Sequence, residues 1–341
     1  MPPALSRQSL LLVYLLALAL LWSNAYFLLV NHPAAHTPAE LSYLRMAQGD
    51  FEVPAPLRYQ VVVPLLARGL AYGARGLANL ISPADKPPFG FSFFLVNTLL
   101  LAGAGLLTFR SAVATGAAPS SALLGTAALL TCGTATYVAG RLVVDSALVL
   151  VVALLYYAIL ARSGPALLTA VVLGPLLTES FLLFLPVVLF CGGFARWGLR
   201  LLALAAGLLL LVAGHWAVDT LLAPTPAAGS NPTVLAYSHL LAGNWGGLLA
   251  GAGAFFPFNL VLLAGGWGGL AAMRQWLAPL RPVPTLLLLL AVLGQVLLGG
   301  ETNWLLAGPV VGVAVALILD RHPLFAPWRR VAGLAPLPET E

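Results

Sequence analysis

Stretches of about 20 consecutive apolar residues recur along most of this 341-residue chain, and they constrain its fold more than any other feature. A helix rises 1.5 Å per residue, so about 20 apolar residues cross the roughly 30 Å hydrocarbon layer of a bilayer. The composition agrees, because 60% of the residues are hydrophobic and only 8% are charged. A soluble domain is about 25% charged. We therefore expect an all-α membrane protein that passes the bilayer several times.

The apolar stretches predict about ten transmembrane helices. They cover residues 10–30, 90–109, 120–138, 143–161, 165–178, 180–195, 198–222, 246–272, 284–300 and 302–319. An even number of crossings puts both termini on one side, and arginines flanking apolar stretches mark the cytoplasmic side. The arginines that this orientation assigns to the cytoplasm are Arg7, Arg110, Arg162, Arg196, Arg200, Arg274, Arg281, Arg321, Arg329 and Arg330. We expect one integral domain over residues 1–341 in a bacterial inner membrane, with no nucleic-acid partner.

Two apolar stretches are interpreted differently from the others. Residues 59–81 carry Arg68 and Arg75 on one helical face together with Pro64, which predicts an amphipathic helix lying in the membrane interface. Residues 165–195 contain the polar triplet 178–180 midway between Arg162 and Arg196, which the predicted orientation places on the cytoplasmic side. We therefore expect two short helices that meet at Glu179.

Most acidic residues then fall on the outer side or at outer helix ends. They are Glu40, Asp50, Glu52, Asp85, Asp145, Glu179, Asp219 and Glu301. Acidic residues contribute little to orientation, and ionisable groups at membrane depth usually mark a functional site. We expect six side chains to converge on one outward cavity: Glu40, Asp50, Arg58, Asp145, Glu179 and Glu301.

The long outer loop over residues 31–89 would roof this cavity. Thr37, Pro38 and Glu40 form a helix start with a capping residue, a proline in the first turn and a carboxylate after it. A helix of about ten residues should follow and end near Gly49. The loop is thus expected to hold two interfacial amphipathic helices.

Several segments resemble the multi-spanning C-type (GT-C-like) membrane glycosyltransferases. In the outer loop these are residues 40–47, ELSYLRMA, and residues 57–67, LRYQVVVPLLA. The turn TES at 178–180 and the segment ETNWLLAGP at 301–309 are also similar to elements of that family. The resemblance implies transfer of a sugar from a polyprenyl-phosphate carrier to a glycan, lipid or protein acceptor at the outer face of the membrane.

This chemistry implies a base for the acceptor hydroxyl and cations for the phosphate leaving group. Glu40 and Asp50 are the candidate bases. Arg45, Arg58 and Arg141 are the candidate phosphate ligands, because a guanidinium binds phosphate oxygens in a bidentate manner. The remaining expected substrate contacts are Asp145, Glu179, His239 and Glu301. Arg141 and Asp145, four residues apart, could instead form an ion pair within one helix.

Two departures from the family pattern keep other functions open. Ala39 stands where the family usually has an aspartate, and Asn303 stands where an arginine is common. A non-catalytic assembly partner of the same fold is therefore one alternative. A secondary transporter is the other, although the acidic residues lie at helix ends rather than at the midplane and no inverted repeat is evident.

No motif in the chain demands a cofactor, and a divalent metal is left open. His32 and His36 are four residues apart, but Pro33 and Pro38 disfavour a regular helix over them. His215 and Asp219 are also four apart, and we expect a hydrogen bond between them inside the bundle rather than a ligand pair.

Overall fold

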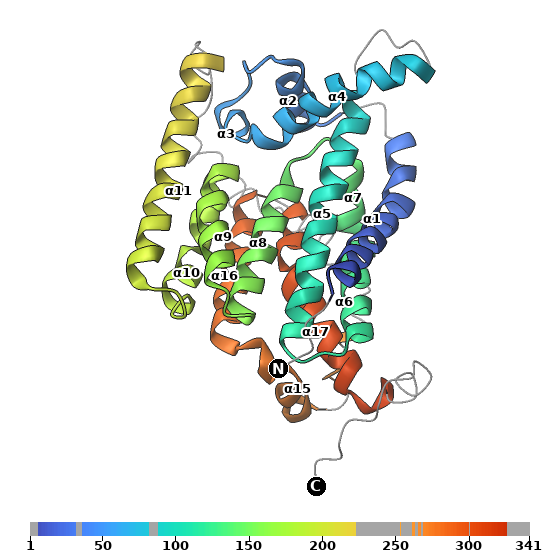
Figure 1. Cartoon of the computed structure of the whole chain (residues 1–341), viewed down its shortest axis with the longest axis vertical. Helices are drawn as coiled ribbons and strands as arrows, with labels where there is room; N and C mark the ends of the chain where they lie inside the picture. The colour runs from blue at the N-terminus through green and yellow to red at the C-terminus, as the bar shows by residue number, and fades with distance from the viewer. Residues whose placement is uncertain are drawn as a thin grey trace.

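In the computed structural model, every regular element is a helix among the residues that the structure describes, 6–31, 36–81, 88–222, 253, 261–262, 265–266, 269–299 and 301–325 (Figure 1). The elements of the first half are α1 (Arg7–Val30), α2 (Pro38–Gln48), α3 (Ala55–Arg58), α4 (Val62–Ile81), α5 (Phe89–Ala114), α6 (Pro119–Thr131), α7 (Gly133–Gly140) and α8 (Asp145–Leu160). The expected all-α class is confirmed.

The second half continues the same pattern. Its elements are α9 (Gly164–Leu177), the 3₁₀ helix η1 (Glu179–Phe184), α10 (Leu185–Cys191), α11 (Trp197–Ala217), the π-helical turn η2 (Val218–Leu222), α15 (Leu270–Leu277), η3 (Ala278–Leu280), α16 (Pro282–Gly299), η4 (Glu301–Ala307), α17 (Gly308–Arg321) and η5 (Pro323–Phe325). The chain therefore breaks between residues 177 and 179, as the polar triplet predicted.

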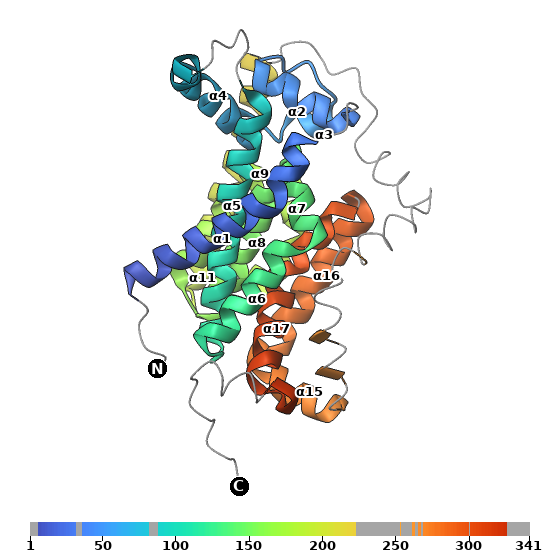
Figure 2. The same cartoon turned by 90° about the vertical axis from the view of Figure 1, so that its right-hand side faces the viewer.

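The long helices run along the longest axis of the molecule, and α2, α3 and α4 cover one end of them (Figures 1 and 2). We call this end the α2 end and the opposite end, where α15 lies, the α15 end. Helices α5 and α8 start at the α2 end, whereas α9, α11 and α16 start at the α15 end. The junctions α8–α9 and η3–α16, with their arginines, therefore lie at the α15 end.

Among the described residues, four helices are long and apolar enough to cross a membrane. They are Arg7–Val30, Phe89–Ala114, Trp197–Leu222 and Asn303–Arg321. The expected crossing over residues 246–272 lies mostly outside the described residues, so the total of ten crossings stays a prediction. Two bent pairs raise the number of candidates to six among the described residues: α6 with α7, bent by 59°, and Ala271–Leu280 with Pro282–Leu297, bent by 85°. Helices α8 and α9 have only 16 and 14 residues, and at 1.5 Å per residue both fall short of the hydrocarbon thickness.

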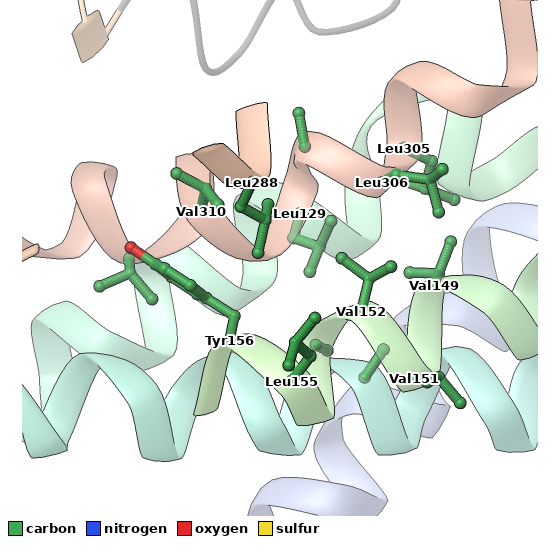
Figure 3. Packing of buried hydrophobic residues seen from close by; sticks show 14 of the residues in the cluster. Leu129, Val149, Val151, Val152, Leu155, Tyr156, Leu288, Leu305, Leu306 and Val310 are labelled. Atoms are coloured by element: carbon green, nitrogen blue, oxygen red, sulfur yellow. The ribbon is translucent and has the colours of Figure 1, made fainter. Parts of the chain in front are cut away.

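Helix α8 is the centre of the main hydrophobic core. Its side chains Val149, Val152, Leu155 and Tyr156 are buried against residues of α6, η4 and α17, including Leu129, Leu305, Leu306 and Val310 (Figure 3). Ala, Val and Leu dominate this core. A second, smaller core joins α2 and α4 to the starts of α5 and α8 through Tyr43, Met46, Ala67, Phe93 and Ala147. The layer at the α2 end is therefore packed onto the bundle.

Helices α6 and α17 approach each other through two glycines. A Cβ atom on Gly125 would lie 2.3 Å from the carbonyl oxygen of Gly312 and 3.0 Å from the Cβ of Ala316. We expect Gly125→Ala to lower the free energy of unfolding by about 1–3 kcal/mol, because the helices must separate to admit the methyl group. Gly90→Ala is the matched control, because no heavy atom lies within 4 Å of the added Cβ. Unfolding in mixed micelles measures both, and equal effects would contradict this packing.

Candidate functional site

Two groups of polar side chains lie at the α2 end. The first is an ion pair between Glu40 of α2 and Arg141, which follows α7. The second consists of Arg58, Tyr59, Glu179, His215 and Asp219, and we call it the His215 cluster. The two groups have different characters, because the first is buried and closed whereas the second is partly exposed.

Glu40 closes the first turn of α2 and binds Arg141 at the same time. The Thr37 backbone N–H donates to Glu40 Oε2 at 2.9 Å, and the Glu40 backbone N–H donates to Thr37 Oγ1 at 3.3 Å. This reciprocal pair is a capping box and confirms the predicted helix start. The guanidinium of Arg141 binds both carboxylate oxygens, Nε to Oε1 at 2.5 Å and Nη2 to Oε2 at 2.6 Å. Glu40 itself is fully buried.

Arg141 is held in place by a buried amide on α5. The Asn97 Nδ2 group donates to the carbonyl oxygens of Arg141 and Val143, both at 3.1 Å, and Asn97 Oδ1 accepts from Ser146 Oγ at 2.6 Å. Arg141 is extended and lies before α8, which begins at Asp145. The alternative of an ion pair between Arg141 and Asp145 within one helix is therefore wrong, because the two residues do not share a helix.

The environment of Glu40 makes it a weak base. Burial alone would raise the pKa of Glu40, but the hydrogen bonds from Arg141 and Thr37 and the charge of Arg141 lower it to about 2. A carboxylate that is so strongly stabilised accepts a proton poorly at neutral pH. The geometry gives the predicted base Glu40 a structural role, because it ties the segment that carries α2, α3 and α4, which we call the first loop, to the bundle.

Asp50 and Arg45 lie at the surface and bind each other. Arg45 Nε donates to Asp50 Oδ2 at 2.7 Å, and its Nη2 lies 2.6 Å from the same oxygen. Both side chains are exposed, and the hydrogen bond from Arg45 lowers the pKa of Asp50. The second predicted base and one of the predicted phosphate ligands thus form a pair that is separate from the His215 cluster.

Arg58 and Tyr59 bring the first loop into contact with the end of α11. Arg58 Nη1 donates to Asp219 Oδ1 at 3.4 Å, and the Tyr59 hydroxyl donates to Asp219 Oδ2 at 3.1 Å. Arg58 is 4% exposed, whereas the Asp219 side chain is 44% exposed. Burial and then the hydrogen bond to Asp219 raise the pKa of Tyr59, so the phenol stays protonated and donates.

His215 joins this contact to the break between α9 and α10. Its ring stacks on Tyr59, with a centroid distance of 3.8 Å and an interplanar angle of 12°. Its Nε2 atom lies 3.2 Å from Glu179 Oε1, in an orientation that does not meet the geometry of a hydrogen bond. The contact is therefore electrostatic when the imidazole is protonated. His215 and Asp219 both contact Tyr59, in place of the expected bond to each other.

Local structure places Glu179 and Asp219 at the α2 end. Thr178 is extended and its hydroxyl accepts from the Ser180 backbone N–H at 3.4 Å, which starts the 3₁₀ turn that carries Glu179. Gln295 of α16 donates to the Ser180 carbonyl oxygen and fixes this turn. At the end of α11 the helix widens into the π-helical turn that contains Asp219. Polar residues thus interrupt both apolar helices where they reach the first loop.

The six side chains that were expected to share one cavity divide among separate places. Arg58 and Glu179 belong to the His215 cluster, Glu40 pairs with Arg141, and Asp50 lies at the surface. Asp145 begins α8 and acts electrostatically on Tyr43, whose hydroxyl donates to Gln60 Oε1 at 2.6 Å. His239 and the side chain of Glu301 lie outside the described residues.

The sequence contained some signals for this arrangement and lacked others. The spacing of His215 and Asp219 at the end of an apolar helix drew attention to that end. Asn97 and Gln295, which support the ion pair and the turn at Glu179, were not singled out. Each is one amide in a long apolar helix, and such an amide gains its meaning only from its partner on another helix.

The His215 cluster brings together groups that can take part in acid–base chemistry and in binding an anion. It offers an imidazole beside a carboxylate, and a guanidinium 3.4 Å from a second carboxylate. Among the described side chains there is no group of three or more histidine, cysteine or acidic residues that could hold a metal ion. The divalent metal therefore stays a prediction.

Comparison of the chain with protein-family models, with curated proteins and with solved structures finds no match.

Proposed function

We propose that the protein is a membrane glycosyltransferase that moves a sugar from a polyprenyl-phosphate carrier to an acceptor, with the His215 cluster as its centre. In this proposal the α2 end faces the outer side of a bacterial inner membrane and the arginines of the α15 end face the cytoplasm. The observation that carries it is the contact between His215 and Glu179 beside the buried Arg58, because three distant segments of the chain meet there.

The reaction assigns a role to each member of the cluster. His215 takes the proton of the acceptor hydroxyl, and the negative charge of Glu179 stabilises the protonated imidazole. The acceptor oxygen attacks the anomeric carbon, the bond from that carbon to the phosphate oxygen breaks, and the phosphate leaves with the bonding electrons. Arg58 stabilises the departing phosphate. Its 3.4 Å contact with Asp219 is longer than the 2.7–2.9 Å of strong charge-assisted bonds, so a phosphate can replace it.

A lipid-linked substrate fits the helix next to the cluster. Helix α4 begins three residues after Tyr59 and is packed on one side through Val63 and Ala67. Its other side exposes large hydrophobic side chains, which are Leu65, Leu66, Leu70 and Tyr72. An amphipathic helix of this kind lies in the membrane interface. It supports the proposal because a polyprenyl chain could approach the cluster along an apolar surface.

A second candidate, a non-catalytic assembly partner of the same fold, is favoured by one observation. Ala39 stands where the family resemblance expects an aspartate, and the neighbouring Glu40 is occupied by Arg141 and Thr37. In this alternative the first loop has lost its acid–base group, and the His215 cluster only holds α11 to the loop.

Binding of undecaprenyl monophosphate to the purified full-length protein distinguishes the two candidates. We expect Arg58→Gln to weaken this binding by about 10- to 100-fold, because a hydrogen bond to a charged group contributes about 1.5–3 kcal/mol. Arg58→Lys should have an intermediate effect, since an ammonium group does not reproduce the bidentate contact. Native mass spectrometry in detergent measures the bound fraction.

Two further variants make this experiment decisive. Asp219→Asn should preserve or strengthen binding, because it removes the carboxylate that competes with the phosphate for Arg58. Arg45→Gln is the matched control, since Arg45 is exposed and pairs with Asp50. The absence of binding by the unaltered protein, or an equal effect of Arg45→Gln and Arg58→Gln, would favour the non-catalytic candidate.

A further inference from the structure

The last turn of α8, at the α15 end, is closed by an arginine in an unusual conformation. The Ser163 backbone N–H donates to the Ala158 carbonyl oxygen at 2.9 Å, and Arg162 between them has φ of 52°. This is the left-handed position that follows many helices, where glycine is preferred because a Cβ atom is disfavoured. Arg162 therefore occupies a position that its backbone does not favour, and its side chain is exposed.

A second arginine meets the same turn from another part of the chain. Arg281, between η3 and α16, also has a positive φ, of 54°. Its Nη1 atom donates to the Ile159 carbonyl oxygen at 3.0 Å. Arg162 lies close enough to act electrostatically on Arg281. Two like charges are thus held near each other at the end of α8.

Neither arginine has a carboxylate partner in the part of the chain that the structure describes. Asp320 is the described acidic side chain nearest this end in the fold, and it accepts a hydrogen bond from Ser121 at 3.3 Å. The partial negative charge at the carboxyl end of α8 offsets part of the repulsion. An anion bound by both guanidinium groups would reduce the repulsion further, and guanidinium groups suit phosphate oxygens.

An exposed apolar stripe on α16 leads away from Arg281. Val283, Leu286 and Leu290 are 63%, 59% and 54% exposed, and their spacing of three and four places them on one face. A membrane lipid has the same arrangement, with a phosphate group at the surface and an acyl chain running from it into the hydrocarbon layer. The stripe therefore favours a lipid phosphate over a free phosphate ion as the ligand.

We infer that Arg162 and Arg281 form a binding site for the phosphate group of an anionic membrane lipid, whose acyl chain lies along Val283, Leu286 and Leu290. The site is at the opposite end of the bundle from the His215 cluster. It does not depend on the proposed transferase activity, and neither proposal fails with the other.

Native mass spectrometry of the full-length protein with phosphatidylglycerol and phosphatidylcholine tests this site. We expect the unaltered protein to retain phosphatidylglycerol preferentially. Arg162→Gly should reduce this preference about fivefold, the effect of one basic residue near a lipid surface. The same variant should unfold at an equal or higher temperature in phosphatidylcholine, because glycine suits a φ of 52°. A loss of lipid preference without a loss of stability separates binding from folding.

A second arginine variant and a matched control complete the test. Arg281→Gln should also reduce the preference for phosphatidylglycerol. Arg196→Gln should leave the preference unchanged, because Arg196 is an exposed residue directly before α11, which also starts at the α15 end. An unchanged preference in both Arg162→Gly and Arg281→Gln overturns the site. Stabilisation by inorganic phosphate alone that equals stabilisation by phosphatidylglycerol overturns the assignment to a lipid.

Discussion

Replacing His215 by asparagine is expected to lower the rate of sugar transfer by about 10²–10⁴-fold, the usual contribution of a general base. The variant should still bind undecaprenyl monophosphate, because Arg58 is unchanged. Transfer from a panel of radiolabelled polyprenyl-phosphate hexoses in isolated membranes measures the rate. Glu179→Gln should cause a smaller loss, since it keeps the imidazole but removes the charge that lies 3.2 Å away.

The control for this experiment is an acidic residue outside the cluster. Asp50→Asn removes a carboxylate that also lies at the α2 end, but this carboxylate pairs with Arg45 at the surface. Transfer should therefore continue at the unaltered rate in this variant. Full activity in His215→Asn, or a comparable loss in Asp50→Asn, would move the base away from His215.

Breaking the buried pair between Glu40 and Arg141 should have the largest effect on stability. Glu40→Gln leaves Arg141, a largely buried cation, without its counter-charge, and such a loss costs about 3–5 kcal/mol. The double variant Glu40→Gln with Arg141→Gln should recover part of this loss, because the unpaired charge is gone. Asp50→Asn, which breaks an exposed pair, should cost less than about 1 kcal/mol. Unfolding in mixed micelles compares the three.

The same pair predicts how stability depends on pH. The pKa of Glu40 is lowered in the folded protein to about 2 from an ordinary value of 4.5, so folding favours the ionised carboxylate. Its contribution is fully present above pH 4.5 and is lost as the pH falls from there to about 2. Glu40→Gln should remove this part of the acid dependence. An identical acid profile in the variant and the unaltered protein would show that Glu40 does not titrate in this range.

The sequence predicted local features of this molecule well. The helix start at Thr37 and the break at Glu179 each depend on residues that are neighbours in the chain, and both are present. Pairing between distant segments could not be predicted in the same way. Glu40 binds an arginine 101 residues later, and Tyr59 binds an aspartate 160 residues later. Many polar residues were available as partners, and only the packing of α2 and α3 on the bundle selects among them.

The described residues contain four to six candidate spans, and the difference from the expected ten crossings has a related reason. Apolar composition shows that a segment avoids water, but it does not show whether lipid or other helices replace the water. Tyr156 and Val152 of α8 are fully buried inside the bundle. Helix α8 is therefore apolar because it lies within the core, and its 16 residues need not match the thickness of the bilayer.

The two contacts between distant residues, Glu40 with Arg141 and Arg58 with Asp219, can form only in a fixed order while the chain is synthesised. Arg58 and Asp219 are separated by 161 positions, and Glu40 and Arg141 by 101. At roughly 5–20 residues per second, Asp219 emerges roughly 8–32 s after Arg58, and Arg141 emerges earlier. The buried pair can thus close first and dock the loop, and the His215 cluster is completed only when α11 has been made. A ribosome that stalls before α11 leaves a chain with a docked α2 and an incomplete cluster.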